Sequence, residues 1–266
     1  MLKGKKIVLG VTGGIAVYKA VDLVSRLRKQ GAQVRVVMTE HAQQFVTPLT
    51  FKEISGNQVA VSMWSANQEF NVEHISLANW ADVFLVAPAT ANILAKMAYG
   101  LADDLLSTTL LASPAPIIVC PAMNTNMYLN PATTENIAKL ESRGVTVMTP
   151  AVGMLACGTS GPGRLPEPQQ IVEFVSAFFA RREGDMRGLK VLVTAAGTRE
   201  PIDPVRFVGN RSSGKMGYAV AQMAAERGAE VLLISGPSAL SIPANVKAIN
   251  VETTNEMLNV CLDAYD

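Results

Sequence analysis

The sequence contains few of the residues that cross-link a chain or bind a metal ion. Its 266 residues include 3 cysteines and 2 histidines. Cys120, Cys157 and Cys261 lie far apart, with no CxxC spacing and an odd total. We therefore expect no disulfide framework and no metal site, and this cysteine usage fits a reducing compartment, the cytoplasm.

An excess of charge of one sign is also missing. The 23 Lys and Arg residues are offset by 22 Asp and Glu residues, which gives a formal net charge of +1. Such a balance gives no electrostatic footprint for nucleic acid or for an anionic membrane. No apolar run reaches the ~18 residues of a membrane-spanning helix. The first run, 7–11, is interrupted by Thr12, Gly13 and Gly14, which favours a buried strand over a secretory signal. Nucleic-acid and membrane partners are therefore not expected.

Apolar residues, in contrast, are abundant. They make up 49% of the chain, against 17% charged residues, enough for a substantial core. Short runs rich in Val and Ile alternate with segments of helical spacing. The runs predict strands at 7–11, 34–38, 83–87, 117–120 and 145–148, and helices at 17–30, 91–99, 105–112 and 133–143. Strands that alternate with helices are typical of βαβ units, so the predicted fold class is α/β with a doubly wound parallel sheet in three layers.

A second unit is predicted to begin near residue 189. Residues 181–185 are polar and contain a glycine, as a linker would. A strand is then predicted at 189–194, a helix at 218–227 and a strand at 231–234, which repeats the order seen at the start of the chain. We therefore expect a first domain over 1–183 and a second, Rossmann-like α/β domain over 189–266. The second is short beside the roughly 100–150 residues of a typical domain, and we expect it to be partial.

The first strand is followed by the turn Thr12-Gly13-Gly14-Ile15-Ala16. Glycines let the backbone approach a ligand closely, and the N-terminus of the next helix favours an anion such as phosphate. The turn is not a GxGxxG motif, and Thr39 rather than an acidic residue follows the second strand. That indicates a mononucleotide rather than a dinucleotide. A tight turn chosen only for packing is the alternative.

Two further polar loops follow predicted strands, at 88–92 and at 121–127. In open α/β sheets such loops meet at the carboxyl ends of the strands, where ligands bind. Asn92 and Asn124 suit the amide edge of a ring or a carboxylate, and Met123 and Met127 suit an apolar face. The alternative is that these asparagines only cap helices.

Two side chains could carry acid–base chemistry. His74 is a candidate because imidazole titrates near neutral pH, although a lone histidine is more often structural. His41 is expected to be exposed. Cys157 lies in the segment 153–163, which has glycines at positions 153, 158, 161 and 163. This glycine content predicts a mobile loop. Cys157 is therefore either a thiol on a lid over the substrate or an incidental surface thiol, whereas Cys120 is expected to be a buried apolar side chain.

Taken together, these motifs resemble the flavin-containing cysteine decarboxylases, and especially the bifunctional phosphopantothenoylcysteine decarboxylase/phosphopantothenate–cysteine ligases. The resemblance spans the whole chain. It is carried by TGGIAVYK (12–19), His74, APATAN (87–92), PAMNTNM (121–127), ACGTSGPGR (156–164) and AGTREPIDPVRFVGNRSSGKMG (196–217).

The resemblance implies a flavodoxin-like fold, a homotrimer that assembles into a homododecamer, and decarboxylation of 4′-phosphopantothenoylcysteine after its thiol is oxidised with FMN. His74 would be the base, Cys157 the proton donor and Asn124 the amide that binds the substrate carboxylate. Contacts to FMN would come from Gly13, Gly14, Ile15, Thr39, Thr90, Ala91, Asn92 and Ala122. Contacts to the substrate would come from Asn124, Met127, Met154 and Ala156.

The resemblance also implies that 189–266 is the start of a ligase domain. Arg206, Asn210, Ser212 and Lys215 match its acyl-cytidylate site and the loop beside it. CTP and Mg²⁺ would be required only by a complete ligase half, and relatives have a much longer one. Tyr128, where many relatives have Trp, leaves the packing over the substrate open.

Two other functions remain possible at this point. One is an FMN-dependent decarboxylase of peptidyl cysteine, for which the segment after 189 has no use. The other is a non-enzymatic FMN-binding regulatory subunit, which would not need His74, Asn124 and Cys157 together.

Overall fold

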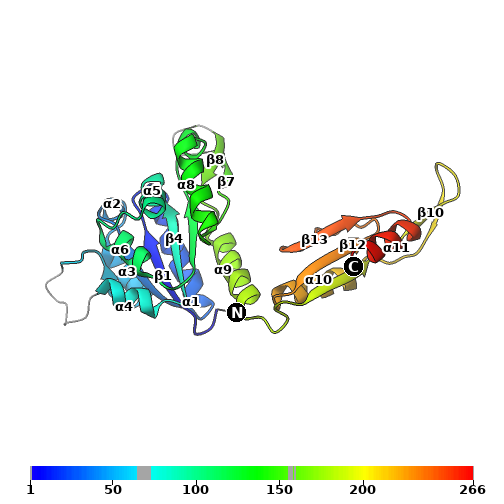
Figure 1. Ribbon diagram of the computed structural model, residues 1–266, viewed down its shortest axis with the longest axis horizontal. Helices are drawn as coiled ribbons and strands as arrows, with labels where there is room; N and C mark the ends of the chain where they lie inside the picture. The colour runs from blue at the N-terminus through cyan, green and yellow to red at the C-terminus, as the bar shows by residue number, and fades with distance from the viewer. Residues whose placement is uncertain (1, 65–72, 155–157, 159, 266) are drawn as a thin grey trace. The chain divides into compact units, whose positions relative to one another are not determined.

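The computed structural model describes residues 2–64, 73–154, 158 and 160–265 (Figure 1). The chain divides into two compact units, Met1–Glu173 and Phe174–Asp266. The division falls within helix α9 (Pro168–Glu183). Each unit is described by itself.

The first unit is built on a six-stranded parallel sheet with the order β3-β2-β1-β4-β5-β6. Its strands are β1 (Lys6–Val11), β2 (Gln33–Met38), β3 (Val59–Ala60), β4 (Val83–Ala89), β5 (Ile117–Pro121) and β6 (Thr146–Val147). The chain winds outward from β1 to β3 and then crosses to β4 on the other side of β1. The predicted doubly wound parallel sheet is confirmed, and its topological switch point lies between β1 and β4.

Helices cover both faces of this sheet (Figure 1). The helices of the first unit are α1 (Val17–Lys29), α2 (Glu40–Gln43), α3 (Pro48–Ser55), α4 (Glu73–Trp80), α5 (Ala91–Tyr99), α6 (Leu105–Ala112), α7 (Thr125–Tyr128) and α8 (Pro131–Ser142). Leucines and isoleucines of α4, α5, α6 and α8 form one buried cluster with Val8, Phe84 and Val86 of the sheet. Helix α1 packs outside this cluster, on β2 and β4, and against α3.

The ends of the helices follow the expected chemistry. The side chain of Asn130 caps α8, since its Oδ1 accepts a hydrogen bond from the Ala132 N–H at 3.0 Å, and Pro131 occupies the first turn. Gly31 and Gly144, just beyond α1 and α8, have φ values of 86° and 85°, which favour glycine.

The glycine-containing segment near residue 160 differs from its prediction. Ala151–Met154 (β7) and Ser160–Arg164 (β8) form an antiparallel pair of strands, so the prediction of a loop is wrong for these residues. Gly163 has a φ of 124°, and a Cβ there would collide with the Met123 carbonyl oxygen. The Met123 N–H in turn donates to the Gly163 carbonyl at 2.9 Å. Glycine is thus used for a close backbone approach rather than for mobility.

The second unit contains a three-stranded parallel sheet in the order β13-β12-β9. Its elements are β9 (Lys190–Ala195), β10 (Arg199–Pro201), β11 (Phe207–Gly209), α10 (Lys215–Glu226), β12 (Glu230–Ser235), β13 (Val246–Asn250) and α11 (Thr254–Asp263). The succession β9–α10–β12 is the βαβ unit predicted from the sequence, and α10 packs on β9 and β12. Between β9 and α10 the chain forms the antiparallel pair β10–β11.

Among the described residues, no helix is long and apolar enough to span a membrane.

Candidate active site

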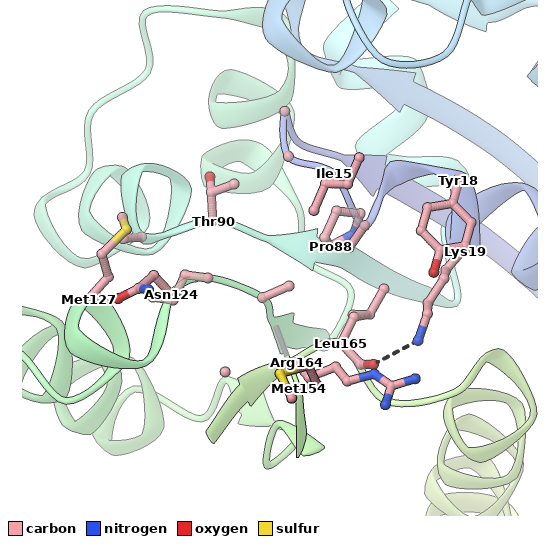
Figure 2. Close-up of a pocket in the computed structure, with 17 residues that line it drawn as sticks. Ile15, Tyr18, Lys19, Pro88, Thr90, Asn124, Met127, Met154, Arg164 and Leu165 are labelled. Atoms are coloured by element: carbon pink, nitrogen blue, oxygen red, sulfur yellow. Dashed lines mark hydrogen bonds between the residues drawn. The ribbon is translucent and has the colours of Figure 1, made fainter. Parts of the chain in front are cut away.

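A cavity of about 650 Å³ lies at the carboxyl ends of β1, β4 and β5, beside the switch point (Figure 2). Most of its walls are apolar. It is lined by Gly13, Gly14, Ile15, Ala16, Tyr18, Lys19, Pro88, Thr90, Ala91, Ala122, Met123, Asn124, Met127, Met154, Gly163, Arg164 and Leu165. The three loops that were predicted to converge therefore meet around one cavity, which β8 and the residue after it also border.

Thr12 joins two of these loops. Its hydroxyl donates a hydrogen bond to the Pro88 carbonyl at 2.7 Å and accepts one from the Thr90 N–H at 3.1 Å. Thr12 is almost fully buried. Because a buried hydroxyl with both roles satisfied holds two backbones together, Thr12 keeps the turn after β1 next to the end of β4 and the residue after it.

The two glycines of the first turn differ in their surroundings. A Cβ at Gly13 would lie 2.7 Å from the His41 carbonyl carbon, so nothing larger than glycine fits there. A Cβ at Gly14 would meet only Thr90 Cγ2, at 3.9 Å, and Gly14 itself lines the cavity. Ala16, which precedes α1, provides no side-chain cap. The start of α1 can therefore receive an anion from the side of Gly14.

One end of the cavity carries an amide and a thioether. Asn124, at the start of the short helix α7, accepts a hydrogen bond on Oδ1 from the Asn126 N–H at 2.8 Å. Helix capping, the alternative role for this residue, is thus observed. Asn124 nevertheless lines the cavity, and Figure 2 shows it beside Met127 and on the same side as Thr90. Its role toward a carboxylate stays a prediction.

The other end carries two cations. The buried Lys19 Nζ donates to the Leu165 carbonyl at 3.4 Å and to Glu167 Oε1 at 2.9 Å. Arg164 Nη2 donates to the same carboxylate oxygen at 2.7 Å. The hydrogen bond from Lys19, together with the nearby charge of Arg164, lowers the pKa of Glu167 below its usual value.

Three predicted site residues do not line this cavity. Thr39 caps α2 by accepting from the Ala42 N–H at 3.3 Å. Asn92 is exposed on α5, and His74 is half-buried in the first turn of α4. Cys157 and Ala156 lie outside the described residues.

Sequence reasoning also missed residues that do line the cavity. Tyr18, Lys19, Pro88, Arg164 and Leu165 were not assigned to the site. Lys19 carried a usable signal, since it lies in the first turn of the helix that follows the glycine-containing turn. Arg164 carried none, because the β7–β8 pairing was not predicted.

In the second unit, the four residues assigned to ligation are all exposed. Arg206 lies between β10 and β11, Asn210 and Ser212 lie between β11 and α10, and Lys215 is the first residue of α10. Asn210 lies against Gly197, at a distance that a Cβ on the glycine would not permit, and its Oδ1 accepts from the Ser212 N–H at 2.8 Å. Arg206 Nε donates to Asp203 at 2.6 Å. Their assignment to a ligase site stays a prediction.

Cys120 is fully buried at the end of β5, as expected, and burial raises the pKa of its thiol to about 12. Its sulfur is 3.9 Å from that of Met148. Cys120 is therefore a packing residue and not a nucleophile.

The fold and the cavity define an α/β protein with a cavity at the switch point of a doubly wound sheet, where ligands bind in proteins of this architecture. Residues 1–180 match the flavoprotein family, and residues 186–266 match the DNA/pantothenate metabolism flavoprotein C-terminal domain. The chain belongs to the flavoprotein family.

Curated relatives are similar over nearly the whole chain. The coenzyme A biosynthesis bifunctional protein CoaBC of Vibrio vulnificus (strain YJ016) is 51% identical over 98% of this chain and 65% of its own length. The protein of the same name from Escherichia coli (strain K12) is 50% identical over 96% of this chain and 63% of its own. The chain thus spans slightly less than two thirds of these relatives.

Solved structures resemble the first unit. A cysteine-to-serine mutant of PPC decarboxylase, complexed with pantothenoylaminoethenethiol, matches with a TM-score of 0.60 and 33% identity, over 66% of this chain and 99% of its own. The FMN binding protein AtHal3 matches with a TM-score of 0.59 and 34% identity, over 66% of this chain and 97% of its own.

Proposed function

We propose that the first unit decarboxylates 4′-phosphopantothenoylcysteine to 4′-phosphopantetheine, with FMN as cofactor, in coenzyme A biosynthesis. The observation that carries the proposal is the cavity at the switch point, with an amide at one end and cations at the other (Figure 2). The substrate has a carboxylate at one end and a phosphate at the other. Similarity to the bifunctional coenzyme A biosynthesis proteins and to PPC decarboxylase supports this assignment.

The cavity fits a flavin mononucleotide. Gly14 leaves open the space that a side chain would fill, and the uncapped start of α1 is a suitable site for a phosphate. Gly13, Gly14, Ile15, Thr90, Ala91 and Ala122 would hold the cofactor. Thr39 and Asn92, which lie outside the cavity wall, are weaker candidates. When bound, FMN would supply reversible two-electron redox chemistry, which the proposed reaction needs in order to oxidise the substrate thiol before CO₂ is lost.

The protein side chains would bind the substrate and move its protons. Asn124 Nδ2 would donate to the substrate carboxylate, and Met127 and Met154 would cover the apolar part of the chain. His74 would act as the base, and the thiol of Cys157 would return a proton to the product.

A neighbouring subunit is part of this proposal. His74 does not line the cavity of its own chain, whereas Ile15 and Tyr18 at the cavity rim are 61% and 60% exposed. A trimer, further assembled into a dodecamer, would cover these side chains and could supply His74 from an adjacent subunit. Analytical ultracentrifugation tests the assembly, and a monomer that decarboxylates at full rate would contradict it.

For the second unit we propose the opening part of a CTP- and Mg²⁺-dependent phosphopantothenate–cysteine ligase. The match of 186–266 to the flavoprotein C-terminal domain supports this, and it disfavours a decarboxylase of peptidyl cysteine. Arg206, Asn210, Ser212 and Lys215 would contribute to that site. We expect no CTP-dependent ligation by a polypeptide of these 266 residues, and we place the protein in the cytoplasm with the rest of this chemistry.

Two measurements test the decarboxylase proposal. The purified protein is expected to be yellow, and mass analysis of the released cofactor is expected to give FMN at about one per subunit. Release of CO₂ from 4′-phosphopantothenoylcysteine should depend on that cofactor. FAD, or a flavin-loaded protein that leaves this substrate intact, would contradict the proposal and would favour a regulatory FMN-binding role.

A further inference from the structure

Ion pairs hold the two cations at one end of the cavity in place. Glu167 Oε1 accepts hydrogen bonds from both Lys19 and Arg164, at 2.9 and 2.7 Å. Lys19 Nζ also donates to the Leu165 carbonyl, which links α1 to the residue after β8. One carboxylate thus orients two cations that come from distant parts of the sequence, and both cations line the cavity.

This end keeps an excess of positive charge. Lys19 and Arg164 are the only charged residues among the described residues that line the cavity, and Glu167 compensates one of the two. The side chain of Lys19 is 9% exposed and has two acceptors. Arg164 is 44% exposed, and among the described residues only its Nη2 has an acceptor. Its Nε and Nη1 remain available as donors.

Arg164 also lies close to β7. A Cβ at Gly153 would meet the Arg164 Nη1 at 3.5 Å, so the glycine leaves room for the guanidinium group. Figure 2 shows Arg164 and Lys19 on the side of the cavity opposite Asn124 and Met127. A ligand that reaches Asn124 with one end would therefore bring its other end toward Arg164.

We propose that Arg164, oriented by Glu167 and backed by Lys19, binds the phosphomonoester of the substrate and selects the phosphorylated over the dephosphorylated form. This inference deepens the proposed function and rests on it. The N–H groups on Nε and Nη1 can donate charge-assisted hydrogen bonds to the oxygens of a phosphate dianion. The phosphate of the cofactor would instead bind at the start of α1, which has no side-chain cap and where Gly14 leaves space.

The test compares two substrates, 4′-phosphopantothenoylcysteine and pantothenoylcysteine, in the flavin-loaded protein. We expect the intact protein to prefer the phosphorylated substrate in kcat/KM. The Arg164→Gln variant should reduce this preference by about 10- to 100-fold, since a charge-assisted hydrogen bond contributes about 1.5–3 kcal/mol. The loss should appear mainly in the KM of the phosphorylated substrate, and Arg164→Lys should recover part of it. Arg26→Gln removes an equal charge from α1 outside the cavity and is the matched control, which should keep the preference.

A binding measurement separates this inference from the proposed function. Calorimetric titration with 4′-phosphopantetheine and with pantetheine needs no turnover. If neither substrate is decarboxylated, the proposed function fails, whereas tighter binding of the phosphorylated compound that is lost in Arg164→Gln would still support the phosphate site. Equal binding of the two compounds by the intact protein overturns the inference. Loss of FMN in Arg164→Gln, with an equal fall for both substrates, would assign Arg164 to the phosphate of the cofactor and would overturn it too.

Discussion

The hydroxyl of Thr12 donates a hydrogen bond to the carbonyl oxygen of Pro88 at 2.7 Å, across 76 residues of sequence. This single contact joins the turn after β1 to the end of β4, the two strands between which the sheet reverses its order. The hydroxyl oxygen of Thr12 also accepts a hydrogen bond from the Thr90 N–H. The cavity therefore opens between two loops that one buried side chain holds together.

Replacement of this hydroxyl should destabilise the protein. In Thr12→Val the shape of the side chain is kept, but the Pro88 carbonyl and the Thr90 N–H both lose their partner. We expect the free energy of unfolding to fall by about 1–3 kcal/mol, and the affinity for FMN to fall as well, because the loops separate. Urea unfolding followed by fluorescence and a flavin titration would measure both. Thr12→Ser keeps the hydroxyl and should retain most of the stability and most of the affinity for FMN. Equal losses of both in the two variants would assign the effect to packing.

Much of this fold was predictable because buried parallel strands have a simple pattern. The runs at 7–11, 34–38 and 83–87 each lie inside an observed strand, and the helices at 91–99 and 105–112 are observed with the same ends. The elements α3 and α4 were not predicted, and neither was the β7–β8 pair. Glycine-containing strands lack the apolar alternation on which a strand prediction depends.

The cavity was predictable only where it follows strand ends. Gly13, Gly14, Thr90 and Asn124 lie in loops whose convergence is a property of parallel sheets. Arg164 reaches the cavity only through the pairing of β7 with β8, a contact between segments that no local pattern specifies.

Gly13 and Gly14 should respond differently to substitution. Gly14→Asp places a carboxylate beside the start of α1, where the phosphate of the cofactor would bind, so we expect loss of FMN with little loss of stability. Gly13→Ala forces a methyl group against the backbone of His41, so we expect it to destabilise the fold by about 1–3 kcal/mol. Flavin content and thermal unfolding would separate the two effects. Gly14→Ala is the control and should keep both properties, because its Cβ meets only Thr90 at 3.9 Å.

His74→Asn is expected to keep FMN and to lose decarboxylation. His74 lies on α4, away from the cavity lining of its own chain, so the cofactor should bind normally. Loss of an acid–base group typically lowers the rate about 10²–10⁴-fold. Single-turnover measurement of CO₂ release in the flavin-loaded variant checks this. His41→Asn, at an exposed position, is the control and should be unaffected. Near-normal turnover in His74→Asn would make His74 a structural residue.

The ion pair between Lys19 and Glu167 should make stability depend on pH in the acid range. The pKa of Glu167 is lower in the folded protein than its usual value of 4.5, mainly because of the hydrogen bond from Lys19. Its contribution is therefore present above that usual value and is lost as the pH falls through the lowered one. Because the carboxylate is half exposed, we expect at most about 1 kcal/mol.

The comparison uses Glu167→Gln, whose stability deficit should be largest at neutral pH and should vanish in acid. Glu135→Gln removes an exposed carboxylate of α8 that forms no ion pair with a described residue, and it serves as the control. Unfolding free energies measured across the acid range decide the matter. A deficit in Glu167→Gln that stays constant with pH would show that the carboxylate acts through packing alone.

Cys157→Ser should separate the oxidative half of the reaction from formation of the product. Serine is nearly the same size as cysteine, but its hydroxyl is a far weaker acid than a thiol with a pKa near 8.5, so delivery of the final proton should fail. Oxidation and loss of CO₂ depend on other groups and should continue. The variant is then expected to accumulate an enethiol that is two hydrogens lighter than 4′-phosphopantetheine.

A related structure gives this expectation a precedent, since a cysteine-to-serine mutant of PPC decarboxylase is complexed with pantothenoylaminoethenethiol. Mass spectrometry after a single turnover would detect the enethiol directly. Cys261→Ser, in the second unit, is the matched control and should form the ordinary product. If Cys157→Ser also forms the ordinary product at the unmodified rate, the thiol is incidental, and the final proton must come from another group.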